Sequence, residues 1–172
     1  MVSLREAIIA SNTNQAFGDA AAGSATGDRI VFASSLNGLS QSLVNGEYEI
    51  TDDLVITGRT FDITLDGANS SRIFNINTSE TVRLTNLSLV NGEADRGGAI
   101  LSDAGGVTAL NGVALTANSA TGVGGGGIFF SGGSLFATGL TATENVADGA
   151  SAIGGAIYQL SLIHISEPTR PY

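Results

Sequence analysis

The chain has 172 residues, of which 42% are hydrophobic and 24 are glycine, and it contains no cysteine; this composition predicts a folded domain and excludes disulfides and thiolate metal sites. All seven basic residues are arginine and the net charge is −9, so nucleic acid is a poor partner for this chain. No long apolar run is present, which argues against membrane contact, and divalent cations and neutral glycans are the ligand classes left open.

A short amphipathic helix is predicted over residues 3–12, SLREAIIASN. Ser3 and Glu6 have the spacing of a capping box, and Leu4 and Ile8 lie on one apolar face. Small and polar residues follow as far as residue 28, and this composition is typical of a loop. We therefore expect residues 1–28 to form a helix and a loop that cover one end of the domain.

Short β-strands are predicted from Arg29 onward, because apolar and polar residues alternate between turns rich in Gly and Asn. The strand candidates are RIVF, LVITG, FDITLDG, RIFNI and VRLTNLSLVNG. Nothing in the composition marks a domain boundary before residue 159. We expect one continuous all-β domain over residues 29–159.

The second half of the chain contains a repeat. Each unit combines an alternating strand, a turn near Asn, a loop and Gly-Gly-x-Ile, and Asn118 and Asn145 are 27 residues apart while Gly97 and Gly125 are 28 apart. A unit of short strands cannot bury its apolar face alone, so successive units must stack strand on strand. Leucine-rich repeats have a similar length but require a helix or a Leu-rich arc. A parallel β-helix is the better prediction.

The repeated residues have structural explanations in such a stack. The isoleucines Ile100, Ile128 and Ile157 should point inward, and the paired glycines let the backbone bend where a Cβ would collide. Asn118 and Asn145 occupy equivalent positions, with Asn91 one place earlier, and Asn tolerates the left-handed turn conformation. Stacked amides of this kind form hydrogen-bonded ladders. We interpret these residues as turn residues and not as a ligand site.

The sequence resembles a known family. VSLREAI followed by DRIVF, LVITG and LDGANSSRIF is similar to the bacterial surface proteins named for a Cys-Ser-Leu-Arg-Glu-Ala-Ile motif. The units beginning at Gly97, Gly125 and Gly154 resemble the Gly-Gly-Ala-Ile repeats of chlamydial polymorphic outer membrane proteins. The match departs from the family pattern at Val2, where the motif has Cys. A second family element, Phe-x-x-Asn, keeps its Asn and loses its Phe.

This resemblance implies a right-handed, pectin-lyase-like parallel β-helix from an exported protein. It implies an extracellular or cell-surface location, with signal and anchor outside this fragment. The expected role is that of an adhesive or structural stalk, and the expected partners are glycans or a neighbouring cell surface.

Parallel β-helices also include polysaccharide lyases and hydrolases, so an enzyme is the alternative. A calcium-dependent lyase needs clustered carboxylates with a Lys or Arg base, and an inverting hydrolase needs two separated carboxylates. The chain has no lysine, no Gly-His-Gly and no paired-Asp hydrolase motif. We therefore assign no catalytic, cofactor-binding or metal residue, and such an enzyme would carry its active site outside this fragment.

The carboxylates that could still form a site are few. Asp62 and Asp66 share one face of a strand, and Asp95 next to Arg96 lies in a loop comparable to that of Glu144 and Asp148. Stacked loops of this kind would form a negative strip able to bind calcium weakly. The full set of candidates is Asp52, Asp53, Asp62, Asp66, Asp95, Asp103, Glu144 and Asp148.

The last residues differ from the rest of the chain. They hold its only histidine, His164, and both prolines, Pro168 and Pro171. The segment LSLIHISEPTR resembles an in-frame translation of a sequencing-library adapter rather than any protein family. We expect residues 160–172 to be non-native, and His164 is left out of every catalytic hypothesis.

Overall fold

The structure is a computed structural model that describes residues 1–58, 63–149 and 152–160. It begins with one helix, α1 (Leu4–Thr13), and the rest is mainly strand. The strands of the first half are β1 (Asp28–Val31), β2 (Ser40–Ser42), β3 (Tyr48–Ile50), β4 (Leu54–Thr57), β5 (Ile63–Asp66), β6 (Phe74–Ile76), β7 (Thr81–Thr85) and β8 (Leu87–Val90), with a 3-10 turn η1 (Ser34–Leu36) before β2. Those of the second half are β9 (Glu93–Ala94), β10 (Ile100–Ser102), β11 (Val107–Asn111), β12 (Ala114–Thr116), β13 (Ser119–Ala120), β14 (Ile128–Phe130), β15 (Ser134–Thr138), β16 (Thr141–Thr143), β17 (Val146–Ala147) and β18 (Ile157–Gln159).

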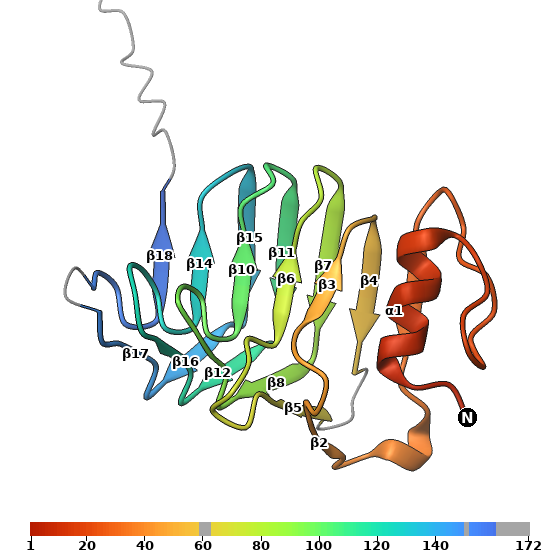
Figure 1. Ribbon diagram of the computed structural model, residues 1–172, viewed down its shortest axis with the longest axis horizontal. Helices are drawn as coiled ribbons and strands as arrows, with labels where there is room; N and C mark the ends of the chain where they lie inside the picture. The colour runs from red at the N-terminus through yellow and green to blue at the C-terminus, as the bar shows by residue number, and fades with distance from the viewer. Residues whose placement is uncertain (59–62, 150–151, 161–172) are drawn as a thin grey trace, which may run out of the picture.

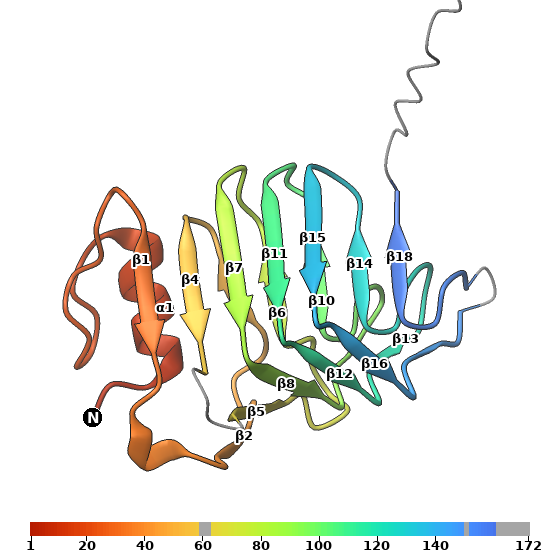
Figure 2. The ribbon, with the colours of Figure 1, turned by 180° about the vertical axis from the view of Figure 1, so that it is seen from behind.

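The strands stack into five coils. Strands β1, β4, β7, β11 and β15 form one upright sheet, β3, β6, β10, β14 and β18 a second, and β2, β5, β8, β12 and β16 a third that joins them at the bottom of Figure 1. A short sheet of β9, β13 and β17 completes the later coils. In Figure 2 the chain runs down the front sheet, back along the bottom and up the rear sheet as it advances from left to right. The fold is therefore a right-handed parallel β-solenoid with one N-terminal helix, as the sequence predicted.

The core consists of columns of apolar side chains that run along the solenoid axis. Ile56, Leu84 and Leu110 stand in register on β4, β7 and β11, and each is at most 2% exposed. Burying a side chain of this size contributes about 1.5–3 kcal/mol. Ile100 and Ile128 are fully buried in a second column, which confirms the inward direction predicted for the repeat. Their counterpart Ile157 is 37% exposed because it lies on the last described coil.

The paired glycines sit where neighbouring backbones come closest. The Gly98 N–H donates to the Gly126 carbonyl oxygen at 2.7 Å, and a Cβ on Gly98 would collide with the carbonyl oxygens of Gly92 and Ser119. Gly97 additionally holds a left-handed φ of 57°, a conformation that side chains disfavour. The steric reason predicted for the glycine pair is therefore confirmed, and the left-handed φ of Gly97 adds a second one.

The recurrence of asparagine at equivalent turns produces an amide ladder around the buried Asn118. Asn118 Nδ2 donates to Asn145 Oδ1 at 2.8 Å and to the Leu89 carbonyl at 3.0 Å, and its Oδ1 accepts the Gly92 N–H at 2.8 Å. The ladder was predicted, and so was the left-handed backbone of Asn91, but Asn118 and Asn145 do not have that conformation. The left-handed position lies one residue earlier in each coil, and it is occupied by Asn91, Ala117 and Glu144 at φ of 51°, 53° and 56°.

Helix α1 closes the N-terminal end of the stack (Figure 1). Ser3 and Glu6 form the predicted capping box. The outer edge of β3 is satisfied by helix side chains, because Arg5 donates to the Glu47 carbonyl at 3.0 Å and Asn12 donates to the Glu49 carbonyl at 2.8 Å. The Asn12 amide oxygen also accepts the backbone N–H of the residue after β3 at 3.0 Å. An edge that would otherwise template further strands is thus covered by side-chain hydrogen bonds.

Candidate functional site

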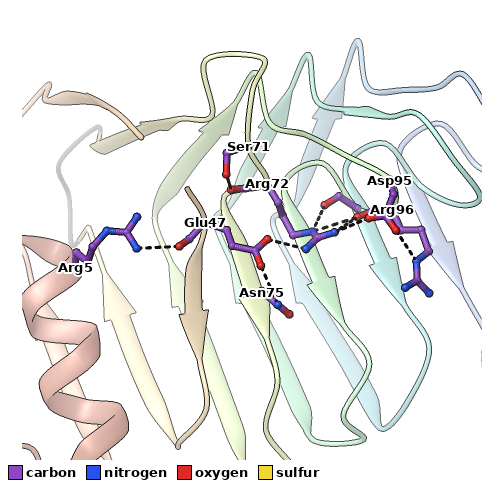
Figure 3. Close-up of polar contacts among 8 residues, drawn as sticks. Arg5, Glu47, Ser71, Arg72, Asn75, Asp95 and Arg96 are labelled. Carbon is purple, nitrogen blue, oxygen red and sulfur yellow. Dashed lines mark hydrogen bonds and ion pairs between the residues drawn. The ribbon is translucent and has the colours of Figure 1, made fainter. Parts of the chain in front are cut away.

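The buried Arg72 is the centre of a polar network on the flank of the second upright sheet (Figure 3). Its side chain is only 9% exposed, and its guanidinium lies 2.7 Å from Glu47 Oε2 and 2.9 Å from Asp95 Oδ1. It also donates to the Arg96 carbonyl at 3.0 Å. Glu47, Arg72 and Asp95 precede β3, β6 and β10, so this one cation joins three successive coils.

Two further contacts extend the network along the flank. Asn75 Nδ2 donates to the second carboxylate oxygen of Glu47 at 3.0 Å, and Arg96 Nε lies 3.4 Å from the other oxygen of Asp95. Both acidic side chains are therefore shared between a coil-joining arginine and a second donor. Carboxylates engaged in this way stabilise the stack and are poorly placed to act as bases.

A row of side chains on the outer face of the same sheet changes from polar to aromatic along the axis. The outer row is Glu49, Asn75, Leu101, Phe129 and Tyr158, in register on successive strands. The rings of Phe129 and Tyr158 stack with centroids 5.1 Å apart, and the Arg96 guanidinium lies 4.9 Å from the Phe129 centroid. Tyr158 is half-buried, and its ring continues the stack formed by the Arg96 guanidinium and the Phe129 ring.

The carboxylates near β4 and β5 have structural partners. Asp52 accepts from the Asn14 side chain at 3.1 Å and from the Asp53 N–H at 2.8 Å. Asp66 accepts from the Ala68 N–H at 2.8 Å and from the Asn91 side chain at 3.1 Å, which makes it the anchor of a turn. Its predicted partner Asp62 lies outside the described residues.

The carboxylates predicted to form a negative strip do not all occupy equivalent positions in successive coils. Asp95 and Asp148 follow the equivalent strands β9 and β17, and Thr121, after β13, lies between them. Two coil steps correspond to about 9.6 Å at the usual strand spacing. Glu144 follows β16 on the other side of the short sheet, and Asp103 is exposed beyond β10. Within residues 1–58, 63–149 and 152–160, no group of three or more His, Cys, Asp or Glu side chains could hold a metal ion.

A cavity of about 610 Å³ lies between α1, the loop after it and β1. Its wall is mainly apolar, with Leu4, Ala7 and Ile30 among the lining residues, and Ser11 also contributes to it. Ser11 is 2% exposed, and its hydroxyl has no hydrogen-bond partner among the residues that the structure describes. The helix therefore covers the outer edge of β3 with hydrogen bonds. The cavity beside β1 means that the outer edge of β1 is covered only in part.

Sequence reasoning missed the residues that organise this flank. Arg72 and Glu47 stand before unremarkable strands, and nothing in their local sequence marks them, because their partners come from neighbouring coils. The only available signal was the scarcity of cations in an acidic chain, which makes each arginine valuable as a counter-ion. The arrangement offers a rigid outer face with an aromatic end.

Comparison of the chain with known proteins found no matching family model, no matching curated protein and no matching solved structure. No helix in the described part of the chain is long and apolar enough to cross a membrane. The fold and the Arg72 network together define a parallel β-solenoid of five coils whose buried polar groups join one coil to the next.

Proposed function

We propose that the chain is part of an exported, repetitive cell-surface or secreted protein, in which the β-solenoid acts as a rigid stalk with an adhesive outer face. The observation that carries this proposal is the use of polar groups within the stack. Arg72 joins three coils and Asn118 joins the turns of three coils. Groups committed to stacking favour a mechanical role over a chemical one.

The resemblance of residues 1–159 to repetitive bacterial surface proteins supports export and adhesion. The outer row supplies a contact surface, because the half-buried Tyr158 ring, stacked on Phe129, suits a neutral sugar ring, which packs its apolar face on an aromatic side chain. Neutral glycans also avoid the repulsion that an acidic ligand would meet on a chain of net charge −9.

A glycan array combined with a cleavage assay tests this function. The purified chain is expected to bind neutral glycans, and Tyr158→Ala is expected to weaken that binding at least about tenfold, as for loss of a buried aromatic contact. Phe17→Ala is the matched control, because Phe17 is an aromatic residue that is 47% exposed at the other end of the molecule. It should bind like the unchanged chain.

The same purified protein is incubated with polygalacturonate. No new reducing ends or unsaturated products are expected. Bond cleavage would overturn the stalk proposal in favour of a polysaccharide lyase or hydrolase. Absence of both binding and cleavage would leave a purely structural stalk and would contradict the adhesive part.

A further inference from the structure

Several asparagines of the described chain are followed directly by glycine. The pairs are Asn37–Gly38, Asn45–Gly46, Asn91–Gly92 and Asn111–Gly112. Asparagine is among the chemically labile residues, because the backbone nitrogen of the next residue can attack its side-chain carbonyl. A following glycine has no Cβ to hinder that attack. Whether a pair reacts therefore depends on what holds the glycine nitrogen in the folded chain.

In two of the pairs the glycine nitrogen is held by the next coil. The Gly92 N–H donates to Asn118 Oδ1 at 2.8 Å, and the Gly112 N–H donates to the Thr138 carbonyl oxygen at 2.9 Å. Each bond crosses from one coil to its successor, so the nitrogen is released only when the coils separate locally. Asn111 is nevertheless exposed, which shows that solvent access alone does not release this nitrogen.

The other two pairs lie in loops outside the stack. Asn37–Gly38 separates η1 from β2, and Asn45–Gly46 separates β2 from β3; both pairs are exposed. Neither glycine N–H donates a hydrogen bond to another residue that the structure describes. The space around both glycines is open, because a Cβ built there would have no atom within 4 Å. These two nitrogens can therefore turn towards the preceding side chain without breaking a contact between coils.

We propose that Asn45 is a site of spontaneous deamidation, which converts this residue to isoaspartate. The deprotonated Gly46 nitrogen attacks Cγ of Asn45, the new N–C bond closes a succinimide ring, and the side-chain nitrogen leaves as ammonia. Water then opens the ring at the α-carbonyl, so that the chain continues through the side-chain carbons. The net change consumes one water and releases one ammonia. This inference does not depend on the proposed stalk or adhesive function.

Asn45 stands next to groups that hold the helix cap in place. Arg5 of α1 donates to the Gly46 carbonyl and, at 3.0 Å, to the Glu47 carbonyl (Figure 3). The Glu47 carboxylate lies 2.7 Å from the Arg72 guanidinium. Isoaspartate lengthens the backbone by one carbon atom directly before these groups, so the two carbonyls no longer meet Arg5 at the same positions. The modification therefore loosens the junction between α1 and β3.

Peptide mapping of aged protein tests the site. The purified full chain is incubated at mildly alkaline pH, folded in one sample and unfolded in urea in another, and each pair is followed by mass spectrometry with aspartate and isoaspartate standards. In urea all the asparagine–glycine pairs should react at comparable rates. In the folded chain Asn91 and Asn111 should slow at least about tenfold, because their reaction needs local opening, whereas Asn45 should slow less than about threefold. Protection of Asn45 equal to that of Asn111 would overturn the proposal.

Asn45→Gln tests the effect on the helix cap. Glutamine keeps the amide but needs a larger ring, so this variant should resist the reaction. The two proteins should have equal Tm when fresh; after parallel ageing the unchanged chain should fall about 2–4 °C below Asn45→Gln, as expected when hydrogen bonds are lost. Asn37→Gln is the control, because Asn37 is equally exposed but is not next to the Arg5 contacts, and it should fall like the unchanged chain. Equal Tm values of all three aged proteins would contradict the loosened junction.

Discussion

The side-chain amide of Asn118 donates to Asn145 Oδ1 at 2.8 Å across one coil step, and the same Asn145 oxygen accepts the Asn118 backbone N–H at 3.1 Å. One amide oxygen thus satisfies both the backbone and the side chain of the preceding turn. Asn118 repeats the arrangement towards Gly92, whose N–H it accepts at 2.8 Å. The turn is therefore held by a side chain supplied by the next coil.

Replacing Asn118 with Leu should destabilise the fold substantially. Leu keeps the volume but leaves the buried Gly92 N–H and Leu89 carbonyl without their partner, and each such group costs about 1–3 kcal/mol. We expect a loss of about 2–4 kcal/mol in the free energy of unfolding, measured by urea denaturation. Asn111→Ala, at an exposed position on β11, should change it by less than about 0.5 kcal/mol.

Replacing Arg72 with Met should loosen the junction of the first three coils. Glu47 and Asp95 would lose their shared cation, and because their side chains are 33% and 68% exposed, water would compensate in part. We expect a loss of about 1–3 kcal/mol, less than the 3–5 kcal/mol for breaking a fully buried pair. Arg83→Met removes an exposed arginine and should be nearly neutral when both variants are measured by urea denaturation. Equal effects of the two variants would show that Arg72 contributes no coil-joining contact.

Gly98→Ala should be among the most damaging single-atom additions in the chain. The new Cβ would meet carbonyl oxygens from Gly92, Ser119 and Gly126, and overpacking costs about 1–3 kcal/mol, with the upper end expected against rigid backbone. Gly132→Ala is the matched control, because its Cβ would come no closer than 3.2 Å to any atom. A folded Gly98→Ala protein as stable as this control would contradict the close approach of the coils.

The helix cap should respond to acid. The Ser3 backbone N–H, 2.8 Å from Glu6 Oε2, and then the Ser3 hydroxyl hold the pKa of the Glu6 carboxyl below its ordinary value of 4.5. Because the folded pKa is lowered, this carboxylate stabilises the helix above about pH 4.5, and the contribution is lost as pH falls through the lower folded value.

A carboxyl NMR titration of Glu6 measures this effect. Ser3→Ala should move the Glu6 pKa upward toward 4.5, because one of its hydrogen-bond donors is lost. Ser35→Ala, in the distant η1 turn, should leave it unchanged. A Glu6 pKa at or above its ordinary value in the unchanged protein would contradict the capping box.

Calcium should have a small effect on stability. Asp95 is engaged by two arginines, and Asp148 stands two coils away from it, so we propose no more than a weak, single-carboxylate site. A ligand present at its dissociation constant adds about 0.4 kcal/mol, which corresponds to about 1–2 °C in Tm for a chain of this size. Differential scanning fluorimetry in millimolar calcium, with magnesium as control, measures this. A calcium-specific rise above about 5 °C would contradict a weak site.

Local sequence patterns were sufficient to predict the elements that depend on neighbours along the chain. The spacing of Ser3 and Glu6 indicated the helix start, and the recurrence of Gly-Gly-x-Ile indicated the coil. Asn118 and Asn145 show where this approach fails: Asn91 has the left-handed backbone expected of it, but in the next two coils Ala117 and Glu144 have it instead. The register between coils decides which residue takes the left-handed conformation and which residue hydrogen-bonds to the neighbouring coil.

The sequence by itself determined the class of the fold, because alternation sets the strand faces and a nearly constant repeat length leaves stacking as the way to bury them. It also determined which residues enter the core columns. Only the tertiary structure decided which charges meet. Glu47, Arg72 and Asp95 are 23 to 25 residues apart along the chain, and the two acids contact the arginine because the coils stack at a register that no local pattern encodes.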